Sequence, residues 1–195
     1  MDFRSLNKLV INLPSRVDRR ENVLTQLNGV DFEFIDGVID NKPLIGIAKA
    51  HLSCVQKAKD NNWPQVLIME DDLILRPNFE KYLNECLYNC PENWDVLLGG
   101  VYNSKQYLNY NDFWDKLGEF RALHFYIVNQ KAYDKILAYD FESMQHIDAW
   151  MNRHGRNLNC FVTKKFIATQ QSGFSNNANA TVDYSHLIRS EERRV

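Results

Sequence analysis

The sequence predicts an α/β fold with a mostly parallel sheet flanked by helices. Two short apolar runs, residues 9–13 and 66–69, have the length and composition of strands that are buried on both faces. Residues 45–60 carry apolar side chains at helical spacing between them. A strand, a tight turn and a helix form the opening of a nucleotide-binding unit, in which ligands bind beyond the carboxyl ends of the strands.

Composition and net charge restrict the classes of protein to which this chain can belong. The chain has 195 residues, 45% hydrophobic and 25% charged, which is ordinary for one globular domain. The net charge of −2 gives no reason to expect a nucleic-acid partner. We expect no transmembrane segment and no signal peptide, and the four cysteines (Cys54, Cys86, Cys90 and Cys160) are expected to be free thiols. These features predict a cytoplasmic location.

The second apolar run ends in three consecutive carboxylates, Glu70, Asp71 and Asp72. Their charge requires compensation if they border a dry core. A divalent cation is one solution, because hard cations take oxygen ligands and bridge carboxylates to substrate phosphates. The alternative is a solvated acidic turn that closes the strand.

The first helix is expected directly after the first strand. Asp18, with Glu21 three residues later, resembles a capping box, and Val23, Leu24 and Leu27 form the predicted buried stripe.

Three arginines, Arg16, Arg19 and Arg20, crowd the turn before this helix. They indicate either a bidentate grip on phosphate or a solvated helix face. Asp36, followed by a glycine at the end of the next predicted strand, is placed to meet a ribose hydroxyl, although the pair is equally common in turns. His51 faces inward on the helix of residues 45–60, where a satisfied core residue is the usual reading.

The second half carries further candidates. Glycines after the strand that starts at Asp95 would let backbone approach a ligand closely. Residues 102–114 mix aromatic and polar side chains, which indicates a sugar-binding or lid loop, or else a packing loop. Strands are predicted at 120–128 and 160–167, with a helix at 130–138 between them. The polar tail from Gln170 suggests a mobile lid that ends in a charged run at 189–194.

Asp148 is the candidate general base. It lies in the first turn of a predicted short helix, where Ile147 and Trp150 would limit its solvation. The alternative is that the acid only favours the helix dipole.

Several blocks, taken in order, carry a resemblance to a known family. They are residues 11–20 (Ile-Asn-Leu followed by the spaced arginines), 35–37, 46–51, 67–72, 94–99, 124–128 and 146–148. Over roughly residues 8–176 the chain resembles the family 25 glycosyltransferases, which include lipooligosaccharide and collagen galactosyltransferases. Two departures are Ala50 before His51, where the family usually has serine, and an ending after Gly173 that keeps only Phe174 and Ser175.

The resemblance implies a GT-A-type fold with a nucleotide-sugar half (about 1–100), an acceptor half (about 101–180) and a tail (181–195). It implies an inverting, metal-dependent transfer of a hexose, galactose or glucose, from a UDP-sugar to a glycan or protein hydroxyl. Mn²⁺ is the expected ion, with Mg²⁺ as the alternative.

The resemblance also implies roles for individual residues. Asp72 would be the principal metal ligand, with His186 or His146 as a further one, and Asp148 the base. Glu70 would face the ribose or the sugar, and Asp71 would serve either role. The remaining nucleotide-sugar residues would be Asn12, Leu13, Arg16, Arg19, Asp36 and His51.

Two other classes remain open from the sequence. A nucleotidyltransferase or phosphohydrolase would need a glycine-rich phosphate loop or further clustered acids, and the sequence shows neither. A catalytically inactive nucleotide-sugar-binding module would be built on the same fold.

Overall fold

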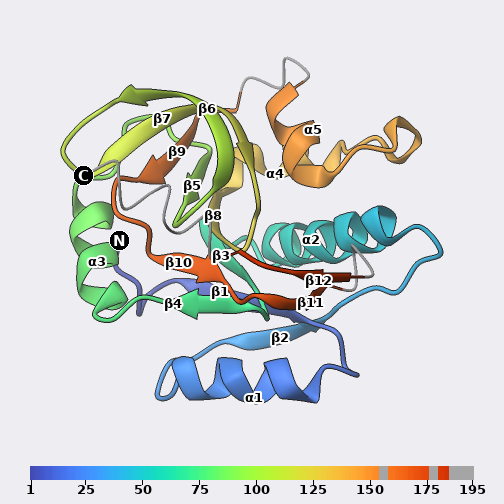
Figure 1. Ribbon diagram of the computed structural model, residues 1–195. Helices are drawn as coiled ribbons and strands as arrows, with labels where there is room; N and C mark the ends of the chain where they lie inside the picture. The colour runs from blue at the N-terminus through green and yellow to red at the C-terminus, as the bar shows by residue number, and fades with distance from the viewer. Residues whose placement is uncertain (154–157, 176–179, 185–195) are drawn as a thin grey trace.

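The computed structural model describes residues 1–153, 158–175 and 180–184 (Figure 1). Its centre is an eight-stranded sheet with the order β2-β1-β3-β8-β5-β9-β7-β6. These strands are β1 (Asn7–Asn12), β2 (Glu33–Asp36), β3 (Gln65–Glu70), β5 (Val96–Leu98), β6 (Tyr102–Asn109), β7 (Trp114–Arg121), β8 (Phe125–Asn129) and β9 (Cys160–Thr163).

The pairings confirm a mixed sheet in which most strands run one way. β1 is parallel to β2 and to β3, and β5 is parallel to β9. β8 is antiparallel to β3 and β5, and β7 is antiparallel to β6 and β9. Within this sheet of described residues, β7 and β8 therefore run against the other six strands. The carboxyl ends of β1, β2 and β3 meet at one edge, which is where ligands bind in α/β sheets.

Helices cover both faces of the sheet. α1 (Val17–Gln26) and α3 (Phe79–Tyr88) pack on one face, and α2 (Pro43–Asp60), α4 (Tyr133–Leu137) and α5 (Ile147–Arg153) pack on the other (Figure 1). Two short 3₁₀ turns, η1 (Gln130–Ala132) and η2 (Phe141–Ser143), flank α4.

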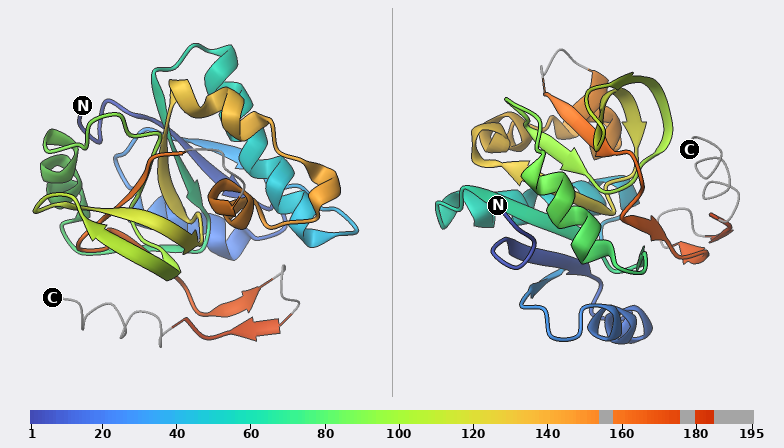
Figure 2. Two further views of the ribbon diagram at one scale, coloured as in Figure 1. Left: turned by 90° about the horizontal axis from the view of Figure 1, so that it is seen from above. Right: turned by 90° about the vertical axis from the view of Figure 1, so that its left-hand side faces the viewer.

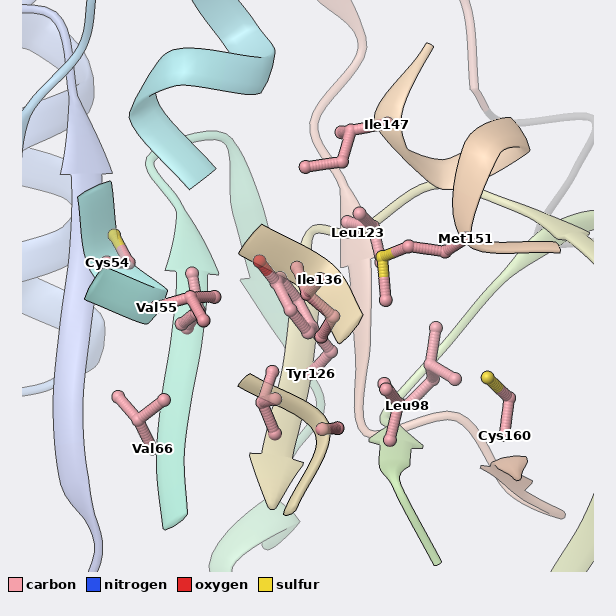
Figure 3. Packing of buried hydrophobic residues seen from close by; sticks show 14 of the residues in the cluster. Cys54, Val55, Val66, Leu98, Leu123, Tyr126, Ile136, Ile147, Met151 and Cys160 are labelled. Carbon is pink, nitrogen blue, oxygen red and sulfur yellow. The ribbon is translucent and has the colours of Figure 1, made fainter. Parts of the chain in front are cut away.

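β3 is buried on both faces, as predicted. Val66 and Ile68 belong to the cluster beneath α2, whereas Leu67 and Met69 belong to the cluster beneath α1 and α3. All four side chains are fully buried. Figure 3 shows Val66 on the α2 side, near Val55. Alternate residues of one strand thus hold the two helical layers together.

The start of α1 differs from the prediction. Arg16 is the N-cap, and Asp18 lies inside the first turn, where it pairs with Arg16 at 2.8 Å instead of capping the helix. Val23 and Leu27 are buried, but Leu24 is 51% exposed. The capping box and the wider stripe are therefore wrong, because α1 lies beside the edge strand β2 and presents only a narrow side to the core.

Residues 102–114 form most of a β-hairpin, so the predicted loop is wrong. β6 pairs with β7 through an irregular register between Tyr102 and Lys105. Aromatic residues are good strand formers, and pairing with a partner strand overrides the polar composition. The strand predicted at 120–128 is also interrupted, because Ala122 has a φ of 77° and breaks the extended chain between β7 and β8.

Gly99 and Gly100 serve protein packing and not a ligand. A Cβ on Gly99 would lie 2.5 Å from Cδ1 of Phe125, and a Cβ on Gly100 would lie 2.4 Å from the carbonyl oxygen of Ala168. Side chains at these two positions would collide with β8 and with the segment after β9. The predicted ligand approach at these glycines is therefore wrong.

The C-terminal segment contains three short strands, β10 (Ala168–Gln170), β11 (Gly173–Ser175) and β12 (Ala180–Val182). β9 is shorter than predicted, and β10 pairs antiparallel with β4 (Leu73–Leu75), so that Gln170 lies opposite Leu73. β11 pairs with β12 at the periphery of the molecule in both views of Figure 2. The predicted charged run at 189–194 and His186 lie outside the described residues.

All four cysteines are free, as predicted. No helix within the described ranges combines the length and hydrophobicity needed to cross a membrane.

Candidate active site

A cavity of about 540 Å³ lies at the carboxyl ends of β1, β2 and β3. Its wall includes the turn after β3, the start of α2, the end of β7 and the start of α5. Eight of the predicted site residues line it: Leu13, Arg19, His51, Glu70, Asp71, Asp72, His146 and Asp148. The fold therefore brings together candidates that are up to 135 positions apart in the sequence, from Leu13 to Asp148.

Three other candidates do not line this cavity. Asn12 is buried below it, Arg16 pairs with Asp18 at the start of α1, and Asp36 is exposed at the end of β2. The glycine that follows Asp36 does line the cavity.

The acidic turn is buried, so a solvated turn is excluded. Asp71 is 6% exposed and Asp72 is 9% exposed. Nη1 of Arg19 lies 2.9 Å from Oδ1 of Asp71 and 3.2 Å from Oδ2 of Asp72. The side-chain amide of Asn12 donates to Oδ2 of Asp71 at 2.8 Å, while its own Oδ1 is buried without a hydrogen-bond partner among the described residues. One arginine thus holds two carboxylates at the floor of the cavity.

Glu70 is held by a second set of partners. Its Oε1 lies 3.2 Å from Nε2 of His51, and Nδ1 of His51 lies 2.9 Å from the hydroxyl of Tyr126. Nε2 of Gln170 donates to Oε2 of Glu70 at 3.0 Å and to Oδ1 of Asp72 at 3.3 Å. His51 is therefore a satisfied buried residue, as the sequence suggests, and it also borders the cavity.

This arrangement pushes the pKa values of two carboxyl groups apart. Burial, together with the negative charge of Glu70, raises the pKa of Asp72 from its ordinary 3.8 to about 7, against the attraction of Arg19. Burial is the largest single influence and acts to raise the pKa of Glu70, but the hydrogen bond from His51, together with the electrostatic attraction of His51, His124 and Arg19, outweighs it and leaves this pKa below its usual value. Asp72 shares Arg19 with Asp71 and lies beside the carboxylate of Glu70, so Asp72 bears most of the resulting repulsion.

The carboxylate oxygens of the acidic turn meet part of what a hard divalent cation requires. Asp72 offers buried carboxylate oxygens, and the charge of a cation would relieve the repulsion that raises its pKa. Within the described parts of the chain, however, no three His, Cys, Asp or Glu side chains are grouped as a ready ligand set. The residues present therefore suit an ion that takes its remaining ligands from substrate phosphate and water.

Asp148 lies on the wall formed by the end of β7 and the start of α5. Its Oδ2 accepts the backbone N–H of Ala122 at 2.9 Å, and its Oδ1 accepts the N–H of Ala149 at 2.6 Å. Arg121 stands next to it, with Nη1 at 3.9 Å from Oδ1. The positive φ of Ala122 turns its N–H toward the carboxylate, so strained backbone orients the candidate base.

Sequence reasoning missed several residues of the wall. Gln170, Arg121 and Tyr184 line the cavity, as does Tyr102, which belongs to the segment predicted as a possible sugar-binding loop. Tyr184 stacks on Tyr102, with ring centroids 5.7 Å apart, and Tyr102 stacks on buried His124 at 5.4 Å. A single polar or aromatic residue outside a motif gives no local signal, and strand pairing alone brings these residues to the site.

Most of the chain that forms this site matches the sequence profile of a known family. Residues 41–183 match the profile of "Glycosyltransferase family 25 (LPS biosynthesis protein)". The chain belongs to glycosyltransferase family 25. The match spans more than half of this family 25 chain and includes His51, the acidic turn and Asp148, whereas Asn12, Arg19 and the rest of β1, α1 and β2 precede it.

The predicted family is therefore confirmed, and the family 25 chain is a glycosyltransferase. An enzyme of this kind acts on a sugar donor and a glycan acceptor.

No curated protein matches this family 25 chain. Among solved structures it is similar to A197 from STIV, with a TM-score of 0.49 and 11% identity over 91% of this chain and 93% of that one. It is also similar to the inositol-1-phosphate CTP transferase from T. maritima (TM-score 0.48, 12% identity, 95% and 77% covered). A third is a glycosyltransferase involved in glycosylation of the major capsid of PBCV-1 (TM-score 0.40, 11% identity, 66% and 62% covered).

Proposed function

We propose that this family 25 chain transfers a hexose, galactose or glucose, from a UDP-sugar to a hydroxyl of a glycan or protein with inversion at the anomeric carbon. One observation carries the proposal. A single cavity has the buried acidic turn on one wall and the oriented carboxylate of Asp148 on another. The nucleotide-sugar half (about 1–100) and the acceptor half (about 101–180) would each supply one of these walls.

The donor would bind over the acidic turn. Asp72, with Glu70 or Asp71, would hold a divalent cation, Mn²⁺ or Mg²⁺, which when bound supplies Lewis-acid stabilisation to the departing diphosphate. Arg19 lies at the same turn and would add a fixed positive charge near the leaving group. Leu13 and the glycine after Asp36 line the adjoining part of the cavity, where the nucleoside would lie.

The acceptor would bind on the side of Asp148. As the acceptor oxygen forms its bond to the anomeric carbon, the bond from that carbon to the diphosphate oxygen breaks. The hydroxyl proton passes to a carboxylate oxygen of Asp148, and UDP leaves with the electron pair. One base on the face of the sugar opposite the leaving group is sufficient for inversion. The two backbone N–H bonds fix the Asp148 carboxylate in place for this proton transfer.

The proposal is tested by calorimetric titration of the protein with UDP, with and without Mn²⁺, followed by transfer assays with UDP-galactose and UDP-glucose. We expect binding that depends on the metal, a slow release of UDP and free sugar, and loss of the metal-dependent binding in Asp72→Ala. Tight UDP binding that is indifferent to Mn²⁺ and to Asp72→Ala would overturn the metal site. Binding with no turnover across an acceptor panel would favour an inactive nucleotide-sugar-binding module.

A further inference from the structure

The two arginines of the cavity stand in different electrostatic surroundings. Arg19 lies within 3.2 Å of both Asp71 and Asp72, so its charge is engaged by the acidic turn. Arg121 has a 40% exposed side chain, and among the described residues its nearest carboxylate oxygen is that of Asp148 at 3.9 Å. This distance is beyond hydrogen-bond range, and a guanidinium carries five N–H donors. Arg121 therefore presents cationic hydrogen-bond donors to the cavity.

The backbone fixes where this charge lies relative to the candidate base. Arg121 is the last residue of β7, and the next residue, Ala122, donates its N–H to Asp148. The guanidinium and the Asp148 carboxylate are thus tied to the same short segment and line the same cavity. A molecule whose hydroxyl meets Asp148 would have its neighbouring substituents within reach of Arg121.

The donor diphosphate is a less suitable partner for Arg121 than the acceptor. In an inverting displacement the base and the leaving group lie on opposite faces of the sugar, so a cation beside the base is on the acceptor side. The acidic turn, where Asp71 and Asp72 share one arginine and Glu70 adds a third carboxylate, would repel an anion that arrived without a cation. The neighbourhood of Arg121 is the part of the cavity wall that favours such a group.

We propose that Arg121 forms a binding site for an anionic group, a carboxylate or a phosphate, on the acceptor. The inference rests on the proposed function, because it takes Asp148 as the base that faces the acceptor. A planar guanidinium binds either group through two parallel hydrogen bonds, which lysine cannot reproduce. The acceptor is then an acidic or phosphorylated sugar whose charged group orients its hydroxyl toward Asp148.

The experiment measures sugar binding by calorimetry, with and without UDP and Mn²⁺. The probes are methyl glucoside, its uronate (methyl glucuronide) and glucose 6-phosphate, which separate the neutral, carboxylate and phosphate cases. We expect the wild-type protein to bind at least one anionic probe roughly 10- to 100-fold more tightly than methyl glucoside, as charge-assisted hydrogen bonds allow. Arg121→Gln should remove this preference, and Arg121→Lys should keep only part of it.

Lys116→Gln is the matched control, because Lys116 is exposed on the same strand, does not line the cavity, and loses the same charge. It should retain the full preference for the anionic probe. Thermal unfolding of each variant checks that the fold is intact. The absence of any preference in the wild type, including the absence of detectable binding, overturns the proposal. A loss of UDP affinity in Arg121→Gln as large as the loss for the anionic probe also overturns it, because Arg121 would then serve the donor.

Transfer assays keep this proposal distinct from the proposed function. An anion preference that depends on Arg121, in a protein that transfers no sugar from any UDP-sugar, would remove the transferase mechanism and leave the anion site standing. Transfer to neutral and anionic sugars with equal kcat/KM would remove the anion site and leave the transferase mechanism standing.

Discussion

The side chain of Gln170 donates a hydrogen bond of 3.0 Å to Glu70, although 100 positions separate the two residues. The same nitrogen lies 3.3 Å from Asp72, and the backbone N–H of Gln170 donates to the hydroxyl of Tyr102. Pairing of β10 with β4 places this glutamine over the acidic turn. A neutral amide thus links the buried carboxylate of Asp72 to the partly buried carboxylate of Glu70, which would otherwise rely on Arg19 and His51 for compensation.

Gln170→Met should destabilise the protein at pH 8 by about 1–3 kcal/mol, because the buried carboxylate of Asp72 and the partly buried carboxylate of Glu70 lose a donor. The measurement is urea unfolding in the presence of a chelator. Gln171→Met is the control, because Gln171 is exposed and its substitution should cost less than about 0.5 kcal/mol. Equal effects of the two variants would show that the bridge to Glu70 and Asp72 contributes nothing.

The free energy of unfolding of the metal-free protein should depend on pH because Asp72 titrates. Its pKa is about 7 in the folded protein, above the ordinary 3.8. Between these values the unfolded chain releases the proton while the folded protein retains it. This contribution to the free energy of unfolding is therefore complete below pH 4 and is lost as the pH rises to 7, by at most about 1.4 kcal/mol per pH unit.

The test compares the wild type with Asp72→Asn by urea unfolding from pH 4.5 to pH 8 in a chelator. The asparagine cannot titrate, so any stability advantage of the wild type should shrink as the pH rises and become constant above pH 7. Subtracting the two curves removes the titration of groups that do not interact with Asp72. Parallel curves over the whole range would contradict the raised pKa.

Arg19→Ala should lower both stability and nucleotide affinity. It leaves Asp71 and Asp72 buried without their shared cation, which costs about 3 kcal/mol in comparable buried pairs. Affinity for UDP with Mn²⁺ should fall about tenfold if Arg19 also faces the diphosphate. Calorimetry and urea unfolding give the two values.

Arg16→Ala is the natural comparison. Arg16 pairs with Asp18, which is 66% exposed, and does not line the cavity, so its loss should weaken UDP binding and stability much less. Equal losses of UDP affinity in both variants would show that Arg16 also contributes to donor binding. Unchanged UDP affinity in both variants would show that the arginines at the start of α1 do not contact the donor.

Asp148→Asn should abolish transfer while UDP binding persists. The amide oxygen can still accept the N–H of Ala122, so the loop keeps its conformation, but an amide cannot take up the acceptor proton. We expect kcat to fall by about 10²- to 10⁴-fold with little change in UDP affinity.

The control is Asp140→Asn, an acid that caps η2 and does not line the cavity. Its kcat should match that of the wild type. Unchanged transfer in Asp148→Asn would remove Asp148 as the base.

Much of the donor side is determined by local sequence. A strand buried on both faces must be apolar throughout, so residues 66–69 and the point where they give way to acids are visible without a structure. The helix from Pro43 to Asp60 follows from apolar spacing, and the ordered blocks indicate the family that the profile match confirms. Predictions that depended on side-chain surroundings failed, as for Leu24 and for the glycines after β5.

Only the tertiary structure decides that the acidic turn is buried and which groups compensate it. Arg19, Gln170 and His51 come from α1, β10 and α2, and no local pattern predicts that they converge on Glu70 and Asp72. The same holds for Arg121 beside Asp148, since a turn at Ala122 and the packing of α5 against β7 bring them together. Local sequence fixes periodicity and charge, whereas contacts between distant segments depend on how the strands pair, and that choice is made by the whole core.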